Sequence, residues 1–93
     1  MIFDDLAEIL KSCEPDIKIV KQHWAKNKFE DRFKELEEIS QQENFWQHPN
    51  QIEISKELQQ LRSNKETYDF VTNSYTDNLE LIELLKEIGR AHV

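Results

Sequence analysis

Apolar side chains recur along the first quarter of the chain at alternating steps of three and four positions. Such spacing predicts a helix that buries one stripe, formed by Phe3, Leu6, Leu10, Cys13, Ile17, Val20 and Trp24. Pro15 lies inside this stripe, where it removes a backbone donor and crowds the preceding turn. The helix therefore either kinks or restarts with Ser12 or Glu14 near its cap, and the unchanged phase of the stripe favours a kink.

A second helix is predicted from Phe29, because the step between Trp24 and Phe29 widens to five and indicates a bend. Its buried line consists of Phe29, Phe33, Leu36 and Ile39, and the charged residues between them form a solvated face. The segment 42–50, which contains Pro49, interrupts the period and predicts a turn.

A long third helix is predicted to begin near Pro49 and to end at Gly89, the only glycine. It would run for about 38 residues, or about 57 Å at 1.5 Å per residue. Polar residues near its middle would permit a local distortion. The apolar spacing is carried by Ile54, Leu58, Leu61, Lys65, Tyr68, Val71, Tyr75, Leu79, Ile82, Leu85 and Ile88.

These three stripes predict an all-α fold in a single helical domain spanning residues 1–93. Short connections favour antiparallel neighbours, so the expected architecture is an elongated antiparallel bundle of about three helices with coiled-coil-like packing. The long third helix would be the spine against which the first two pack.

The negative charge of the chain limits the classes of partner that it can bind. A net charge of −7 and a sequence pI of about 4.9 repel phosphate backbones and anionic membranes, which disfavours direct nucleic-acid binding and membrane binding. The sequence shows neither a transmembrane run of apolar residues nor a secretory signal. Cys13 is the single cysteine and indicates a reducing compartment, so we expect a soluble cytoplasmic protein.

Two stretches, RFKELEE at 32–38 and NFWQHP at 44–49, resemble the start of the bacterial peptide chain release factors of the release factor 2 type. In that family a charged helix ends in an aromatic pair, followed by a proline that opens a long helix. The resemblance runs from about Lys26 to Ile88. His48 departs from it, because the family commonly has an acidic or amide residue there, and this weakens the expected helix cap.

The resemblance implies a non-catalytic N-terminal docking domain for translation termination, which reaches the stalk-base proteins of the ribosome and a GTPase release factor. The Gly-Gly-Gln hydrolysis motif and the Ser-Pro-Phe stop-codon motif of the family are absent from the 93 residues. We therefore expect a fragment, a truncated product or a diverged stand-alone paralogue. Short-range RNA contacts through Lys26, Lys28 and Arg32 stay open.

The residues that could form a functional site are better explained by a role in packing. Phe45 and Trp46 could be an exposed anchor for a partner, but folding back as a plug over the end of the bundle would bury more apolar surface. Trp24 is on phase with the first stripe and is expected in the core. Cys13 is expected to be a small buried apolar group.

No catalytic, cofactor-binding or metal-binding residue is assigned, and no enzyme activity is expected. The side chains of His23, His48 and His92 are too far apart in sequence, from each other and from Cys13, for a helical metal site. Adjacent carboxylates on a helix point about 100° apart and do not converge on a substrate; these pairs are Asp4 with Asp5, Glu30 with Asp31, and Glu37 with Glu38.

The alternative hypothesis is a stand-alone coiled-coil module that dimerises through the same stripes. An apolar strip left uncovered on the third helix would invite a second copy of the chain. Sedimentation is then expected to show dimers whose population rises with concentration.

Overall fold

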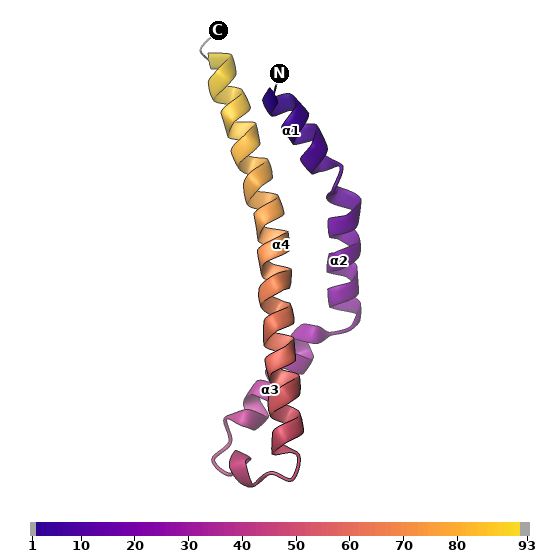
Figure 1. Cartoon of the computed structure of the whole chain (residues 1–93), viewed down its shortest axis with the longest axis vertical. Helices are drawn as coiled ribbons and strands as arrows, with labels where there is room; N and C mark the ends of the chain where they lie inside the picture. The colour runs from indigo at the N-terminus through magenta and orange to yellow at the C-terminus, as the bar shows by residue number, and fades with distance from the viewer. Residues whose placement is uncertain (1, 92–93) are drawn as a thin grey trace. The chain divides into compact units, whose positions relative to one another are not determined.

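The computed structural model describes residues 2–91, and these are almost entirely helical (Figure 1). The elements are α1 (Ile2–Lys11), α2 (Glu14–Lys26), α3 (Phe29–Ser40), the short 3-10 helix η1 (Phe45–Gln47) and α4 (Gln51–Ala91). No strand occurs within residues 2–91, which confirms the all-α class and the long final helix. The side chain of His92 lies outside the described residues.

The contacts of the chain gather in two compact units. The terminal unit combines residues 2–21 with residues 69–91, and the hairpin unit comprises residues 22–68. In the terminal unit α1 packs against the last part of α4, and in the hairpin unit α3 packs against the first part of α4 (Figure 1). The single-domain organisation stays a prediction.

The first predicted helix is divided at Ser12 and Cys13, so the expectation of a kink was wrong. The backbone N–H of Cys13 donates to Leu10 O at 3.0 Å, and the next helix opens with a bond from Ile17 N to Cys13 O at 3.0 Å. Pro15 therefore lies in the first turn of α2, where its missing donor is not needed. Cys13 is exposed in this turn, which also corrects its expected burial.

The buried line of the terminal unit differs in part from the predicted stripe. Phe3, Leu10 and Ile17 are half-buried as the spacing predicts, but Leu6 and Val20 are exposed. Ala7 takes the most buried position of α1, at 2% exposure. A small side chain at this position lets the two helix backbones approach closely.

The bend predicted between Trp24 and Phe29 is confirmed, and its conformation is left-handed. Lys28 has φ 54° and ψ 40°, a region that residues other than glycine and asparagine rarely adopt. Its N–H donates to Ala25 O at 3.1 Å. The side chain of Asn27 also donates to His23 O, at 2.8 Å, and so satisfies a carbonyl at the end of α2.

Replacing Lys28 with glycine is expected to raise the free energy of unfolding by up to about 1 kcal/mol, because glycine adopts positive φ without a steric penalty. Urea unfolding followed by circular dichroism measures the change. Lys26→Gly is the matched control: Lys26 is helical, so the same replacement should lower stability by about 0.5–1 kcal/mol. Destabilisation by Lys28→Gly would contradict the left-handed turn.

The core of the hairpin unit consists of Leu36, Leu58 and Leu61. Phe29, Phe33, Ile39 and Ile54 pack around it, so the whole predicted buried line of the second helix is confirmed. Leu36, at 1% exposure, is the most enclosed of these side chains.

Helix α4 runs without interruption from Gln51 to Ala91. Gly89 lies within the helix and has no positive φ, so its expected role as a terminator was wrong. Val71 and Ile88 were predicted to be buried, but both are exposed, and Thr72 takes the place of Val71 on the buried side. Because an α-helix has 3.6 residues per turn, a long buried stripe needs an extra step of four, which here leads to Thr72. The Thr72 hydroxyl donates to Asp69 O at 3.4 Å. Within residues 2–91, no helix combines the length and the apolar character needed to span a membrane.

Candidate docking surface of the hairpin unit

The aromatic pair between α3 and α4 points in two directions. Phe45 is buried, at 4% exposure, whereas Trp46 is exposed, at 78%. Both belong to η1, and three residues per turn set neighbouring side chains about 120° apart. Their rings meet edge to face, with centroids 5.6 Å apart. The expected plug is therefore confirmed for Phe45 and wrong for Trp46.

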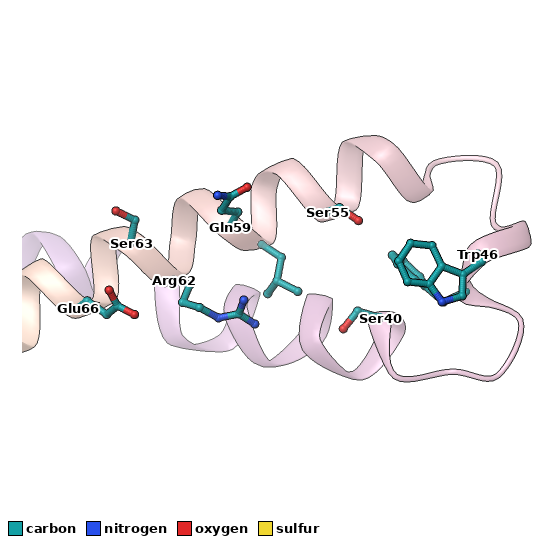
Figure 2. Close-up of a pocket in the computed structure, with 9 residues that line it drawn as sticks. Ser40, Trp46, Ser55, Gln59, Arg62, Ser63 and Glu66 are labelled. Carbon is teal, nitrogen blue, oxygen red and sulfur yellow. The ribbon is translucent and has the colours of Figure 1, made fainter.

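An open groove of about 560 Å³ lies beside this pair (Figure 2). Phe45 and Leu58 provide its apolar side chains. Figure 2 shows Trp46 at the loop end of the groove, with the polar side chains of α4 following along it. The polar lining consists of Ser40, Ser55, Gln59, Arg62, Ser63 and Glu66.

The chemistry of the groove suits contact with a macromolecule. Small serines leave the surface hollow, and an indole beside a hollow is the kind of side chain that dominates protein interfaces. The guanidinium of Arg62 lies 6.0 Å from the centroid of the Phe33 ring, and this cation–π contact limits its rotamers. The groove offers hydrogen-bonding groups and one exposed aromatic anchor.

Trp24 holds the beginning of the hairpin unit together. Its ring stacks on Tyr68 with centroids 4.5 Å apart and an interplanar angle of 7°, and it also meets Phe29 at 4.9 Å. Its Nε1–H donates to Glu30 Oε1 at 3.1 Å. Trp24 is half-buried, so it packs against its neighbours as predicted but is not fully enclosed.

The same carboxylate oxygen of Glu30 accepts a second bond, from Lys65 Nζ at 3.0 Å. The bond from Lys65, followed by the bond from Trp24, lowers the pKa of Glu30, and partial burial opposes this shift. The ion pair joins α3 to α4, and its carboxylate is needed in the charged form.

Because the pKa of Glu30 is lower in the folded chain than in the unfolded one, its contribution to stability is complete above its unfolded value of about 4.5. It is lost as the pH falls through the lowered folded value. Glu30→Gln should therefore flatten the acid limb of a plot of stability against pH, by less than about 1 kcal/mol because the pair is partly solvated. The control Glu38→Gln, on the exposed side of α3, should leave that limb unchanged, and equal effects would contradict the role of Glu30.

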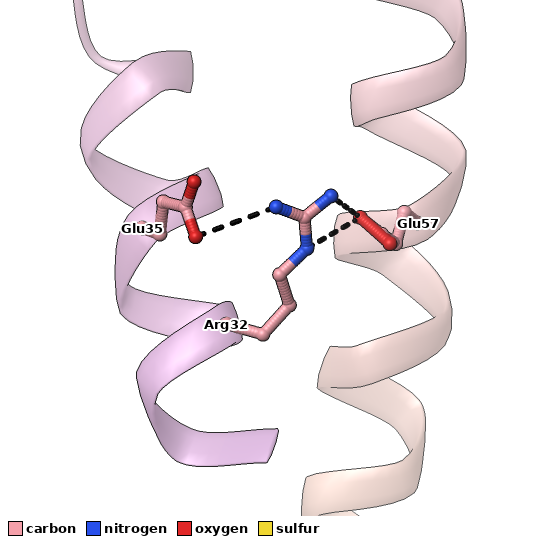
Figure 3. A network of polar contacts seen from close by, with 3 residues as sticks. All are labelled: Arg32, Glu35 and Glu57. Carbon is pink, nitrogen blue, oxygen red and sulfur yellow. Dashed lines mark hydrogen bonds and ion pairs between the residues drawn. The ribbon is translucent and has the colours of Figure 1, made fainter. Parts of the chain in front are cut away.

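Arg32 joins α3 to α4 farther along the hairpin (Figure 3). Its Nε and Nη2 donate to Glu57 Oε2 at 3.0 and 2.7 Å, and Nη1 lies 3.3 Å from Glu35 Oε2. The bonds to Glu57 raise the pKa of Arg32. The three residues considered for RNA contacts, Lys26, Lys28 and Arg32, are all exposed, but Arg32 is engaged with carboxylates.

The remaining candidate residues stay apart. His23 packs beside Phe29, and the Nδ1 of His48 accepts a bond from Asn50 N at 3.0 Å near the start of α4. The described residues contain no group of three or more histidine, cysteine or acidic side chains that could hold a metal. The adjacent carboxylates have different surroundings: Asp4 pairs with Lys86 and Glu30 with Lys65, whereas Asp5, Asp31 and Glu38 are exposed and Glu37 is half-buried.

Comparison with known proteins finds a similar sequence among the release factors. Over 84 residues the chain is 34% identical to peptide chain release factor 2 of Acholeplasma laidlawii (strain PG-8A). The match covers 89% of this chain and 23% of that relative, so the chain spans about a quarter of the relative's length. This confirms the resemblance inferred from the sequence. No protein-family model matches the chain, and no solved structure matches it significantly.

Proposed function

We propose that this chain is a helical docking region of a translation termination factor, which contacts the ribosome without making or breaking bonds. The similarity to a release factor over nearly the whole chain carries the proposal. Its role would be positional: a region anchored on the ribosome restricts where the rest of a factor can reach. The ribosomal partners would be stalk-base proteins, together with a GTPase release factor.

The groove beside Trp46 is the contact surface we favour. An indole that is 78% exposed at a loop tip supplies a large, stiff contact area with little loss of side-chain entropy on binding. The net charge of −7 favours a basic ribosomal protein over bare ribosomal RNA as the group that meets it. The exposed Lys26 and Lys28 would permit local phosphate contacts in addition.

Co-sedimentation with ribosomes carrying a stop codon tests this proposal. The chain should pellet with ribosomes at micromolar concentration, and removal of the stalk-base proteins should abolish pelleting. Trp46→Ala should weaken binding about thirtyfold, as expected for an interface residue worth about 2 kcal/mol. Ile52→Ala is the matched control, because Ile52 is similarly exposed in the same unit and does not line the groove.

Three results would contradict the proposal. The first is a chain that does not bind ribosomes at all, and the second is binding that survives removal of the stalk-base proteins. The third is an equal loss of binding in Trp46→Ala and Ile52→Ala, which would place the contact elsewhere on the chain.

A further inference from the structure

The terminal unit carries a second apolar line on α1, beside its buried one. Phe3, Ala7 and Leu10 face α4, as their burial shows. Ile2, Leu6 and Ile9 follow the same three-or-four spacing about 100° away on the helix, and all three are exposed. Leaving three aliphatic side chains of a ten-residue helix in water is unfavourable by the transfer free energy of each.

The end of α4 repeats this arrangement. Leu81, Leu84 and Ile88 are 52%, 53% and 47% exposed and are spaced by three and four positions. Phe70 extends the same line toward the middle of the helix and is also exposed. The residues that face α1 lie on a different side of α4, around Ile82 and Lys86.

Ion pairs show which side of the α1–α4 pair these lines occupy. Lys86 Nζ lies 3.0 Å from Asp4 Oδ1, and Lys11 Nζ lies 3.4 Å from Glu83 Oε1. These partners run in opposite orders along the two helices, so the helices are antiparallel. On each helix the ion-pairing residues and the exposed apolar line flank opposite edges of the buried line. Both apolar lines therefore lie along the side opposite the ion pairs, and together they form one surface.

We call this surface the apolar face of the terminal unit; its residues are Ile2, Leu6, Ile9, Leu81, Leu84 and Ile88. Its outer edges are acidic. At 100° per residue, Asp5 borders it on α1 and Glu80 and Glu87 border it on α4, whereas Lys11 and Lys86 lie on the ion-paired side. Asp77 interrupts the line on α4. In the terminal unit as a whole, acidic residues outnumber basic ones.

We propose that the apolar face of the terminal unit receives a basic amphipathic helix of a partner protein. Two antiparallel helices with exposed apolar lines on one side form a groove that a third helix fills, with its lysines and arginines placed against the acidic edges. α1 has ten residues, so a docked helix in contact along its length would span about 15 Å, or about three turns.

The charge of the edges decides between occupants. A second copy of the chain would bring a second set of acidic edges against the first, and this like-charge contact disfavours the dimer expected from the sequence. RNA and anionic membranes are repelled for the same reason. This proposal does not rest on the proposed function, because it concerns different residues and a different surface.

Two designed helical peptides and a scrambled control test the inference. The first is an 18-residue peptide with leucines at heptad spacing flanked by lysines, and the second has glutamates in place of the lysines. Fluorescence anisotropy with labelled peptide should show one-to-one binding of the leucine–lysine peptide to the full chain. The leucine–glutamate peptide and a scrambled leucine–lysine peptide should each bind at least thirtyfold more weakly.

Variants of the chain assign the binding to the apolar face. Leu81→Ser combined with Leu84→Ser should weaken binding of the leucine–lysine peptide at least tenfold, and Ile52→Ser, an exposed apolar position of the hairpin unit, should leave it unchanged. Glu80→Lys combined with Glu87→Lys should weaken binding of that peptide and strengthen binding of the leucine–glutamate peptide. Circular dichroism checks that each variant keeps its helix content.

Other outcomes would overturn the inference. Equal binding of both peptides would remove the charge argument, and unchanged binding in the Leu81→Ser, Leu84→Ser variant would place the site elsewhere. Sedimentation of the chain alone gives the remaining outcome. Dimers at micromolar concentration that disappear in this double variant would identify a second copy as the occupant. None of these results depends on ribosome binding.

Discussion

Phe45→Ala is expected to lower the free energy of unfolding of the chain by about 3–5 kcal/mol, the usual effect of truncating an enclosed phenylalanine. Phe45 is 4% exposed and lies in η1, in the loop that joins α3 to α4. Truncation would remove the apolar burial that this ring provides at the end of the hairpin. Urea unfolding followed by circular dichroism measures the effect.

Trp46→Ala provides the comparison, since the two residues are neighbours in η1. Because the indole is 78% exposed, its removal should change the free energy of unfolding by no more than about 0.5 kcal/mol. The same substitution is expected to weaken ribosome binding. Phe45→Ala should therefore affect mainly stability, and Trp46→Ala mainly binding, although the two residues are adjacent. Similar losses of stability in the two variants would show that the tryptophan also closes the bundle.

Leu36→Ala is expected to destabilise the chain by about 2–5 kcal/mol. Leu36 is 1% exposed and packs with Leu58 and Leu61 in the centre of the hairpin unit. Because Leu58 and Leu61 belong to α4, truncation of Leu36 removes contacts between α3 and α4. A loss of this size is a large fraction of the total stability of a small domain, so the variant should begin to unfold at much lower urea concentrations.

Leu36→Met is the matched control, because it keeps the volume of the side chain and should be less destabilising than about 1.5 kcal/mol. If Leu36→Ala and Leu36→Met unfolded at the same urea concentration, Leu36 would not be at the centre of the core. The unfolding midpoint of each variant gives the comparison directly.

The spacing of apolar residues was sufficient to predict the buried line of α3 in the hairpin unit. Phe29, Phe33, Leu36 and Ile39 form its buried line as expected, because α3 is short and one phase of the helical period holds over its whole length. The bend before Phe29 was also predictable from the widened step.

The terminal unit was harder to predict for a reason of backbone geometry. The apolar spacing is the same on both sides of Pro15, so a kinked helix and two separate helices share one pattern. Residues 12 and 13 form a turn that divides the helix, and Cys13 is exposed in this turn. The prediction that the long helix ends at Gly89 also failed. A glycine that ends a helix usually adopts a left-handed conformation, whereas Gly89 has no positive φ and the helix continues through it.

The orientations of Phe45 and Trp46 depend on the three-residue helix η1, which the spacing of apolar residues does not predict. Burial of one ring and exposure of the other follow from 3-10 geometry, which sequence spacing does not distinguish from an irregular loop. Likewise, the apolar face of the terminal unit emerges only once the ion pairs show which sides of α1 and α4 meet.

Those ion pairs also bear on how the chain assembles. Lys11 with Glu83 and Asp4 with Lys86 join residues separated by about 70 to 80 positions, whereas Arg32 and Glu57 are separated by about 25. Bringing distant segments together carries a larger loop-closure entropy, and contacts between them form more slowly. Residues 22–68 should therefore be the nucleus, and docking of α1 onto α4 the late event, so amide protons of α1 should gain protection last in a refolding experiment.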